Sequence, residues 1–136
     1  MVFGFRSVNI WVDNFSFICK NYMSNFSIVT VVYNASGTIT RTIESILNQS
    51  FPVYEYIIID GNSNDDSLRI INSYKDLFTD KNIRFIVVSE NDNGIYDAMN
   101  KGRNLSKGDL IHYLNAGDIV YGEPYFEVCG PLKLPV

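Results

Sequence analysis

Polar side chains follow each of four apolar segments of the sequence, and the last of these segments has the most distinctive end. Residues 109–118 (Asp-Leu-Ile-His-Tyr-Leu-Asn-Ala-Gly-Asp) start polar, become apolar, and finish with Asn115, Gly117 and Asp118. Amide and carboxylate oxygens are the ligands that Mg²⁺ and Mn²⁺ prefer, and such a cation binds diphosphates. Taken alone, the segment is more simply explained as a strand followed by an ordinary turn.

The three earlier apolar segments end in the same way, which favours a binding site over solvated loops. In a parallel sheet the carboxyl ends of the strands share one edge, where ligands bind. The connections expected at the opposite edge lack a repeated carboxylate at a strand end. The earlier segments, each with its polar exit, are 28–33 with Tyr33 and Asn34, 54–60 with Asp60-Gly61-Asn62, and 83–88 with Glu90 to Asp92.

Helical spacings between these segments predict the elements that position the exits. Apolar residues recur at three- and four-residue intervals, and Ser36 or Thr38 could cap the first helix. Strand and helix alternate, which predicts an α/β fold: a parallel Rossmann-like sheet with helices on both faces. The inward residues expected are Ile39, Ile43, Ile46 and Leu47; then Leu68, Ile71, Tyr74 and Phe78; then Ile95, Ala98, Met99, Gly102 and Leu105, with Lys107-Gly108 ending the last helix.

Composition and charge restrict the class of protein. The 136 residues are 46% apolar, enough for one globular domain, and a net charge of −4 argues against nucleic acid as a partner. Cys19 and Cys129 resemble unpaired thiols of a reducing compartment. Without an apolar run of roughly 18 residues, we expect a cytoplasmic protein, either free or peripheral at the inner membrane face.

Several familiar sites are excluded by their motifs. The first strand is not followed by the glycine pattern of a dinucleotide-binding turn, and no Walker loop occurs. Asp60–Asp65 begins like a calcium loop, yet Asp65 and Ile71 occupy positions that need Gly and Glu. A phospho-acceptor signalling domain, which needs acidic residues beside the first strand rather than Asn34, stays as the weaker alternative.

Three further polar residues have simpler interpretations than catalysis. The single histidine, His112, lies within a predicted strand, where a core imidazole is the simplest interpretation. Lys101 and Arg103 could reach a phosphate from the third helix, but solvated helix charges remain the default interpretation of both.

Five motifs in order resemble the nucleotide-sugar half of glycosyltransferase family 2, over residues 26 to about 121. The resemblance implies the GT-A fold and the transfer of a sugar from a nucleoside diphosphate, usually UDP, to an acceptor hydroxyl with inversion. The motifs are Thr30-Val31-Val32-Tyr33-Asn34, Ser45-Ile46-Leu47-Asn48-Gln49-Ser50-Phe51, Ile59-Asp60-Gly61-Asn62-Ser63, residues 89–102 (Ser-Glu-Asn-Asp-Asn-Gly-Ile-Tyr-Asp-Ala-Met-Asn-Lys-Gly) and Leu114-Asn115-Ala116-Gly117-Asp118.

The resemblance also implies a role for each site residue, all of them in holding a UDP-sugar or its Mg²⁺ or Mn²⁺ ion. A metal neutralises the charge that grows on the leaving diphosphate. By position, Tyr33 and Asn34 would lie at the base, Asp60 near the uracil or ribose, Asp92 near the base and sugar, and Asn100 behind this region, with Asn115 and Asp118 on the family's Asp-x-Asp metal motif.

Two departures from the family pattern shape the expectation. Many relatives carry a second aspartate at Gly61, and an aspartate at Asn115 or Gly117; fewer carboxylates imply weaker metal ligation. Both variants resemble bacterial surface-polysaccharide members, whose acceptor would be a glycan or a lipid-linked sugar. Relatives also continue for roughly a hundred more residues, which hold the acceptor site and the general base.

The expected division of the chain follows from these motifs. Residues 1–25 are expected to be an N-terminal appendage, with Met23 as an alternative start; 26–121 form the nucleotide-sugar domain, and 122–136 an irregular tail of a truncated acceptor half. No general base is assigned, because neither Glu123 nor Glu127 matches the family's base. A donor-binding remnant with little or no transfer activity therefore stays open beside an active enzyme.

Overall fold

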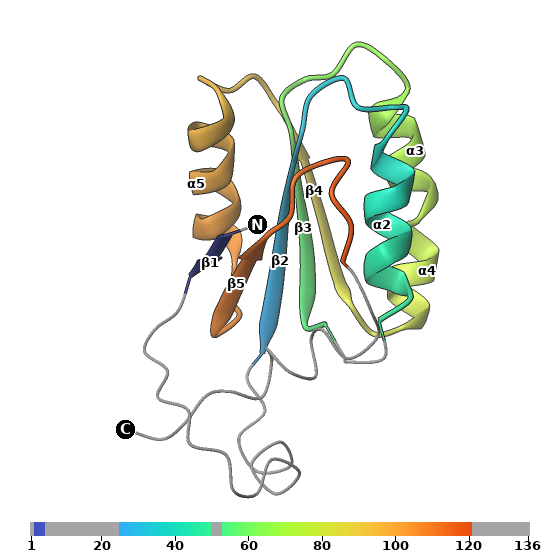
Figure 1. Cartoon of the computed structure of the whole chain (residues 1–136), viewed down its shortest axis with the longest axis vertical. Coiled ribbons are helices and arrows are strands. Elements are labelled where there is room, and N and C mark those ends of the chain that lie inside the picture. Colours follow the sequence, from blue (N-terminus) through green and yellow to red (C-terminus); the bar gives the residue numbers. More distant parts are fainter. Residues whose placement is uncertain (1, 5–24, 50–52, 121–136) are drawn as a thin grey trace, which may run out of the picture.

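The computed structural model describes residues 2–4, 25–49 and 53–120, which form one five-stranded sheet (Figure 1). The order across the sheet is β1-β5-β2-β3-β4. Strands β5, β2, β3 and β4 run parallel, whereas β1 pairs antiparallel with β5 at one edge. The strands are β1 (Val2–Gly4), β2 (Phe26–Val32), β3 (Glu55–Asp60), β4 (Arg84–Ser89) and β5 (Leu110–Tyr113).

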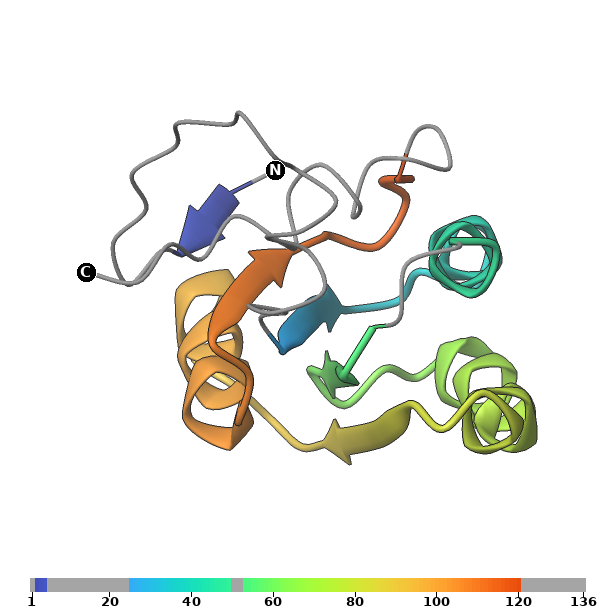
Figure 2. The ribbon, with the colours of Figure 1, turned by 90° about the horizontal axis from the view of Figure 1, so that it is seen from below.

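Helices cover both faces of the sheet, which confirms the predicted α/β architecture. Helices α2, α3 and α4 lie on one face and α5 on the other, as the end-on view shows (Figure 2). The right-handed crossovers of parallel strands require this arrangement. The helices are α2 (Ile39–Leu47), α3 (Ser67–Ser73), α4 (Lys75–Asp80) and α5 (Ile95–Leu105).

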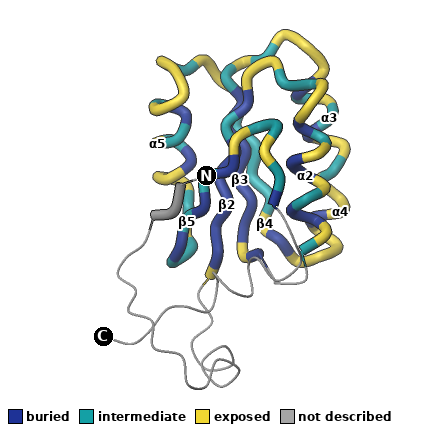
Figure 3. The backbone as a smooth tube through the Cα atoms, viewed as in Figure 1, coloured by how far each residue is buried: buried dark blue, intermediate teal, exposed yellow. Residues whose placement is uncertain are grey.

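Alternation along the central strands divides the core into two clusters. On β2, Phe26, Ile28 and Val32 face the layer of α2, α3 and α4, whereas Val29 faces α5. Every residue of β3 is buried, as expected for a strand covered on both sides (Figure 3). Gly102 lets α5 approach the sheet closely, because an added Cβ there would lie 2.3 Å from a Val29 methyl.

The register of the sheet brings the predicted strand exits together. Val32 pairs with Asp60, and Asp60 pairs with Ser89, so β2, β3 and β4 end level with one another. The segment after β5 continues beside β2, because Leu114 N–H donates to the Val29 carbonyl at 2.9 Å. The loops after these four strands therefore share one edge, as the sequence predicts.

Several local features differ from the sequence expectations. Strand β1 was not predicted, because three residues are too few to show a period. The predicted second helix is divided at Tyr74 into α3 and α4, and Ile71 and Phe78 nevertheless stay buried. Two residues expected to face inward on α5 are instead exposed, because they lie at its ends: Ile95 by 47% and Leu105 by 39%.

The first residues of α2 confirm the predicted position of the cap but not its hydrogen bond. Thr38 occupies the N-cap position as proposed, but within the described part of the chain its side chain makes no capping hydrogen bond to the helix. Its hydroxyl donates instead to the Ala35 carbonyl at 3.4 Å.

None of the helices in residues 25–49 and 53–120 is long and apolar enough to cross a bilayer.

The amino-terminal edge of the sheet is fixed by Glu55, which sequence reasoning did not single out. This carboxylate is fully buried and accepts hydrogen bonds from the Ser27 hydroxyl at 2.7 Å and from the backbone N–H groups of Lys107 and Gly108. Its other oxygen pairs with the Arg84 guanidinium at 2.7 Å. Buried charges are tolerated when they are paired and hydrogen-bonded in this way, so Glu55 anchors the connection between α5 and β5.

Candidate functional site

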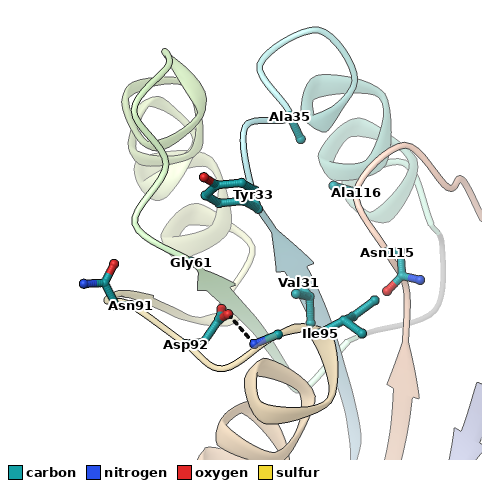
Figure 4. Close-up of a pocket in the computed structure, with 10 residues that line it drawn as sticks. Val31, Tyr33, Ala35, Gly61, Asn91, Asp92, Ile95, Asn115 and Ala116 are labelled. Carbon is teal, nitrogen blue, oxygen red and sulfur yellow. Dashed lines mark hydrogen bonds between the residues drawn. The ribbon is translucent and has the colours of Figure 1, made fainter.

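A pocket of about 610 Å³ opens at the carboxyl edge of the sheet (Figure 4). Its walls come from the exits of β2, β3, β4 and β5, at the edge where open parallel sheets bind ligands. The described residues that line it are Val31, Tyr33, Ala35, Gly61, Asn91, Asp92, Gly94, Ile95, Asn115 and Ala116.

One wall of the pocket consists of Tyr33, Gly61 and Asp92. The Tyr33 side chain is 66% exposed, and its ring lies beside Gly61. A Cβ added at Gly61 would lie 2.8 Å from Oδ2 of Asp92, so the carboxylate occupies the space that a side chain at position 61 would need. The other oxygen, Oδ1, accepts a hydrogen bond from Gly94 N–H at 2.9 Å. The Asp92 carboxylate is thereby oriented within the wall.

The loop that carries Asp92 is fixed from the following helix by Lys101. The Lys101 ammonium donates to the Asn91 carbonyl at 3.0 Å and pairs with Glu90 at 3.0 Å and Asp97 at 3.5 Å. The hydrogen bond to Glu90 is the main cause that raises the pKa of Lys101. In the structure Lys101 thus holds the loop, and contact of Lys101 with a phosphate stays a prediction.

Asp60 lies behind the pocket wall and is fully buried. One carboxylate oxygen accepts a hydrogen bond from the Ser63 hydroxyl, and the other accepts from Ser63 N–H at 3.1 Å and from the Ser89 hydroxyl at 2.7 Å. These bonds join the end of β3 to the end of β4 and to the loop after β3. Contact of Asp60 with a base or ribose remains a prediction, and the observed contacts are to the protein.

Asn34 belongs to a set of hydrogen bonds between the loops after β2 and β3. Its backbone N–H donates to the Ser63 hydroxyl at 2.8 Å, and its side-chain oxygen accepts from Asn64 N–H at 2.9 Å. The neighbouring Ser36 N–H donates to Asp65 at 3.1 Å. A hydrogen bond with Ser67 is the main cause that lowers the pKa of Asp65 to about 2. These bonds keep the two loops together beside the pocket.

The exit of β5 is a tight turn with an oxygen-bearing side chain at each end. Asp118 N–H donates to the Asn115 carbonyl at 3.0 Å, and Gly117 has a φ of +98°, the left-handed value required at the third position of a type II turn. Asn115 lines the pocket, and Asp118 is exposed at the far end of the same turn. In such turns the two end Cα atoms lie within about 7 Å.

The turn offers one carboxylate and one amide oxygen to a divalent cation, from Asp118 and Asn115. Within the described ranges, no three His, Cys, Asp or Glu side chains gather closely enough to hold a metal ion. Mg²⁺ nevertheless binds commonly through one or two carboxylates, with the substrate phosphates and water completing its shell. The Asp118 carboxylate and the Asn115 amide oxygen fit that mode, in which the metal arrives with a diphosphate.

The structure therefore divides the predicted site residues into three groups. Tyr33, Asp92 and Asn115 line the pocket, whereas Asn34, Asp60 and Asp118 adjoin it. Asn100 is exposed on α5 and is not among the described residues that line the pocket. Three residues that line the pocket were not predicted to do so: Asn91, Ile95 and Gly61. Asn91 and Gly61 nevertheless belong to strand exits that the sequence indicated.

His112 lies outside the site, as the sequence predicted. It is buried on β5 with its ring 6.1 Å from the ring of Phe26 in an edge-on arrangement. Burial lowers the pKa of His112 to about 4, so the imidazole is neutral at physiological pH. A neutral core histidine explains this residue without a catalytic role.

The chain is similar in sequence to a bacterial glycosyltransferase named for poly(ribitol-phosphate). It is 32% identical over 103 residues to the poly(ribitol-phosphate) β-N-acetylglucosaminyltransferase TarP of Staphylococcus aureus strain N315; the match covers 73% of this chain and 30% of TarP. The chain spans between 15% and 38% of the length of curated relatives such as these.

Two solved structures share the fold. The first is residues 1–349 of S. aureus TarS in complex with UDP-GlcNAc: its TM-score is 0.67 at 21% identity, over 77% of this chain and 30% of that one. The mannosyltransferase PcManGT from Pyrobaculum calidifontis, in complex with GDP-Man and Mn²⁺, has a TM-score of 0.73 at 16% identity, over 82% of this chain and 33% of that one. The fold resemblance expected from the motifs is thereby confirmed.

The match to a family model covers nearly the whole region in which the motifs occur. Residues 27–128 match the model described as Glycosyl transferase family 2, and this range includes every strand exit that contributes to the pocket. The chain therefore belongs to glycosyl transferase family 2.

Proposed function

We propose that the pocket binds the nucleoside diphosphate of a UDP-sugar together with Mg²⁺ or Mn²⁺. The whole protein would then transfer the sugar, with inversion, to a hydroxyl of a polysaccharide or lipid-linked acceptor. The observation that carries the proposal is the pocket itself, whose lining combines an exposed aromatic ring, an oriented carboxylate and an amide from separate strand exits: Tyr33, Asp92 and Asn115.

The nucleoside end is assigned to the wall of Tyr33, Gly61 and Asp92. The exposed Tyr33 ring offers a flat apolar surface for a base. Oδ1 of Asp92 is bound to Gly94 N–H, and a carboxylate is an acceptor-only group with capacity for further donors. We assign those donors to an N–H of the base or a hydroxyl of the ribose. Asp60 would support this wall from behind through Ser63 and Ser89.

The diphosphate end is assigned to the turn after β5. Asn115 and Asp118 would supply protein oxygens to a cation, and the phosphates would supply others. When bound, the cation neutralises charge on the leaving diphosphate. The turn would hold the diphosphate beside the nucleoside wall, because Asn115 and Asp92 line the same pocket.

The comparisons support this assignment at the level of the family. TarS was solved with UDP-GlcNAc and PcManGT with GDP-Man and Mn²⁺, and both share the fold of this chain. TarP, by its name, acts on poly(ribitol-phosphate), which is a polymer acceptor of the proposed kind.

A thermal-shift titration of the 136-residue chain tests the proposal. UDP with Mn²⁺ is expected to raise the melting temperature more than inorganic phosphate with Mn²⁺, because only UDP reaches the nucleoside wall. Asp92→Asn should reduce the UDP-specific part. Asp80→Asn, which changes an exposed carboxylate on α4, should leave it unchanged. Equal stabilisation by UDP and phosphate would contradict the proposal and favour a signalling or interaction domain.

A further inference from the structure

A threonine on α2 holds the backbone of the turn after β5. Thr42 is fully buried, and its hydroxyl donates to the Asp118 carbonyl at 2.7 Å and accepts from Gly117 N–H at 2.9 Å. The two bonds connect residues 75 and 76 positions apart in the chain. A single side chain therefore satisfies a backbone donor and a backbone acceptor of the turn that carries Asn115 and Asp118.

The turn lies between α2 and β2 and is attached to both. On the β2 side, Ala116 N–H donates to the Val31 carbonyl at 3.4 Å. On the α2 side, one helical turn beyond Thr42, the Ser45 hydroxyl accepts from Val120 N–H at 3.1 Å. Gly117 also packs near Thr38, since an added Cβ there would lie 3.6 Å from the Thr38 Cβ. The segment therefore rests on one face of α2.

The Thr42 side chain stabilises the turn after β5 rather than its own helix. Threonine is a weaker helix former than alanine or leucine, because its branched side chain loses rotamer freedom. Within helices such hydroxyls commonly bond to a carbonyl of the preceding turn, as Ser45 does to the Thr42 carbonyl at 2.8 Å. The Thr42 hydroxyl instead makes its two bonds to Gly117 and Asp118.

We propose that Thr42 is a positioning residue that sets the orientation of the Asn115 and Asp118 oxygens toward a diphosphate-bound cation. The proposal rests on the proposed function of this pocket. Both hydrogen bonds of Thr42 go to the backbone of the turn, so any rotation of that turn breaks them together. Loss of the hydroxyl loosens the turn and leaves the part-buried Gly117 N–H and Asp118 carbonyl without this partner. The nucleoside wall, which belongs to other strand exits, is unaffected.

Two variants of Thr42 separate the hydroxyl from the shape of the side chain. Thr42→Val keeps the branched shape without the hydroxyl, and Thr42→Ser keeps the hydroxyl without the methyl group. Tyr56→Phe serves as the stability control, because it removes a buried hydrogen bond to Thr30 of 3.0 Å in which the turn takes no part. If Thr42→Val does not fold, Thr42→Ala removes the same hydroxyl without adding a methyl in its place.

The measurement is UDP affinity by calorimetry with Mn²⁺ and with EDTA, together with free Mn²⁺ by electron paramagnetic resonance. We expect Thr42→Val to lose about tenfold to a hundredfold of the Mn²⁺-dependent gain in affinity, as misplacement of a binding group does. Its affinity in EDTA should stay within about twofold of that of the original chain, because the nucleoside wall is intact. Thr42→Ser and Tyr56→Phe should retain the Mn²⁺-dependent gain.

Four results would overturn the inference, and they differ from one another. A full Mn²⁺-dependent gain in Thr42→Val or Thr42→Ala would show that the turn does not need the hydroxyl. An equal loss in Tyr56→Phe would show that general stability, rather than the turn, controls metal binding. If the unaltered chain binds UDP without any Mn²⁺ dependence, the metal part of the proposed function fails and the role of Thr42 fails with it; if it binds no UDP, the proposed function fails as a whole.

Discussion

Replacement of Gly61 by alanine tests the nucleoside wall with the least change in composition. The added Cβ would lie 2.8 Å from Oδ2 of Asp92, closer than the ordinary contact of 3.4 to 4 Å. The carboxylate must therefore move by about half an ångström. Because Gly94 N–H holds the other oxygen at 2.9 Å, that movement strains or breaks the bond that orients Asp92.

The expected size of the effect follows from the bond that Asp92 would make to a nucleoside. A hydrogen bond to a charged group contributes about 1.5 to 3 kcal/mol, so its loss should weaken UDP binding roughly tenfold to a hundredfold. The fold should tolerate the change. Gly61 is not among the described glycines with positive φ, and a compatible Gly→Ala change stabilises by about 0.4 to 1 kcal/mol through the unfolded state.

Isothermal titration with uridine and with UDP, beside a thermal melt, provides the assay. Gly37→Ala is the matched control, because an added Cβ at Gly37 has nothing within 4 Å and its φ is likewise not in the left-handed region. Gly61→Ala should lose affinity for both ligands with an unchanged or higher melting temperature, and Gly37→Ala should keep full affinity. Unchanged uridine affinity in Gly61→Ala would refute the assignment of the nucleoside to this wall.

Three further predictions concern residues behind or beside the pocket. Asp60→Asn should lower the free energy of unfolding by about 2 to 5 kcal/mol, because it disturbs a buried, hydrogen-bonded carboxylate. Urea denaturation measures the free energy of unfolding, and a loss below about 1 kcal/mol would contradict the prediction. Lys101→Met should weaken UDP binding, because it frees the loop that carries Asp92. It should cost less than about 1 kcal/mol of stability, because the ion pairs that it removes are partly exposed. Arg103→Met is the control, and equal UDP affinities of the two variants would contradict the prediction. Burial holds the pKa of His112 at about 4, below the ordinary value of about 6.5, so the unfolded state binds the extra proton and stability should fall as pH drops from about 6.5 toward 4. His112→Leu should flatten the dependence of stability on pH between about 6.5 and 4. An unchanged slope in this variant would argue against a lowered pKa of His112 as its cause.

The sheet and the edge that carries the pocket could be predicted because they depend on local patterns and one rule of chain geometry. Branched apolar runs such as Ile28–Val32 indicate buried strands, and right-handed crossovers then bring all the strand exits to one edge. The sequence therefore predicted that Tyr33, Asp92 and Asn115 would meet. Their shared pocket depends on the register of the sheet, which the alternating pattern also sets.

The contacts behind that edge could not be predicted, because they join residues that are distant in sequence. Asp60 bonds to Ser89, and Thr42 bonds to Gly117 and Asp118, across separations of 29, 75 and 76 residues. A hydroxyl in a helix or strand carries no sequence signal for such a partner. The exposure of Ile95 could not be predicted either, because the helical period of a sequence does not indicate where the sheet beneath the helix ends.

A titration of the ¹⁵N-labelled chain with UDP and Mg²⁺, followed by amide chemical shifts, tests the central claim most directly. The two edges of the sheet are distinguishable by amides on each: Gly61, Asp92 and Gly94 at the pocket, and Lys107 and Gly108 at the Glu55 anchor. A nucleotide site at the carboxyl edge predicts saturable shifts at the first three amides and none at the last two. Shifts confined to the Glu55 anchor, or no saturable shift at the pocket, would contradict it.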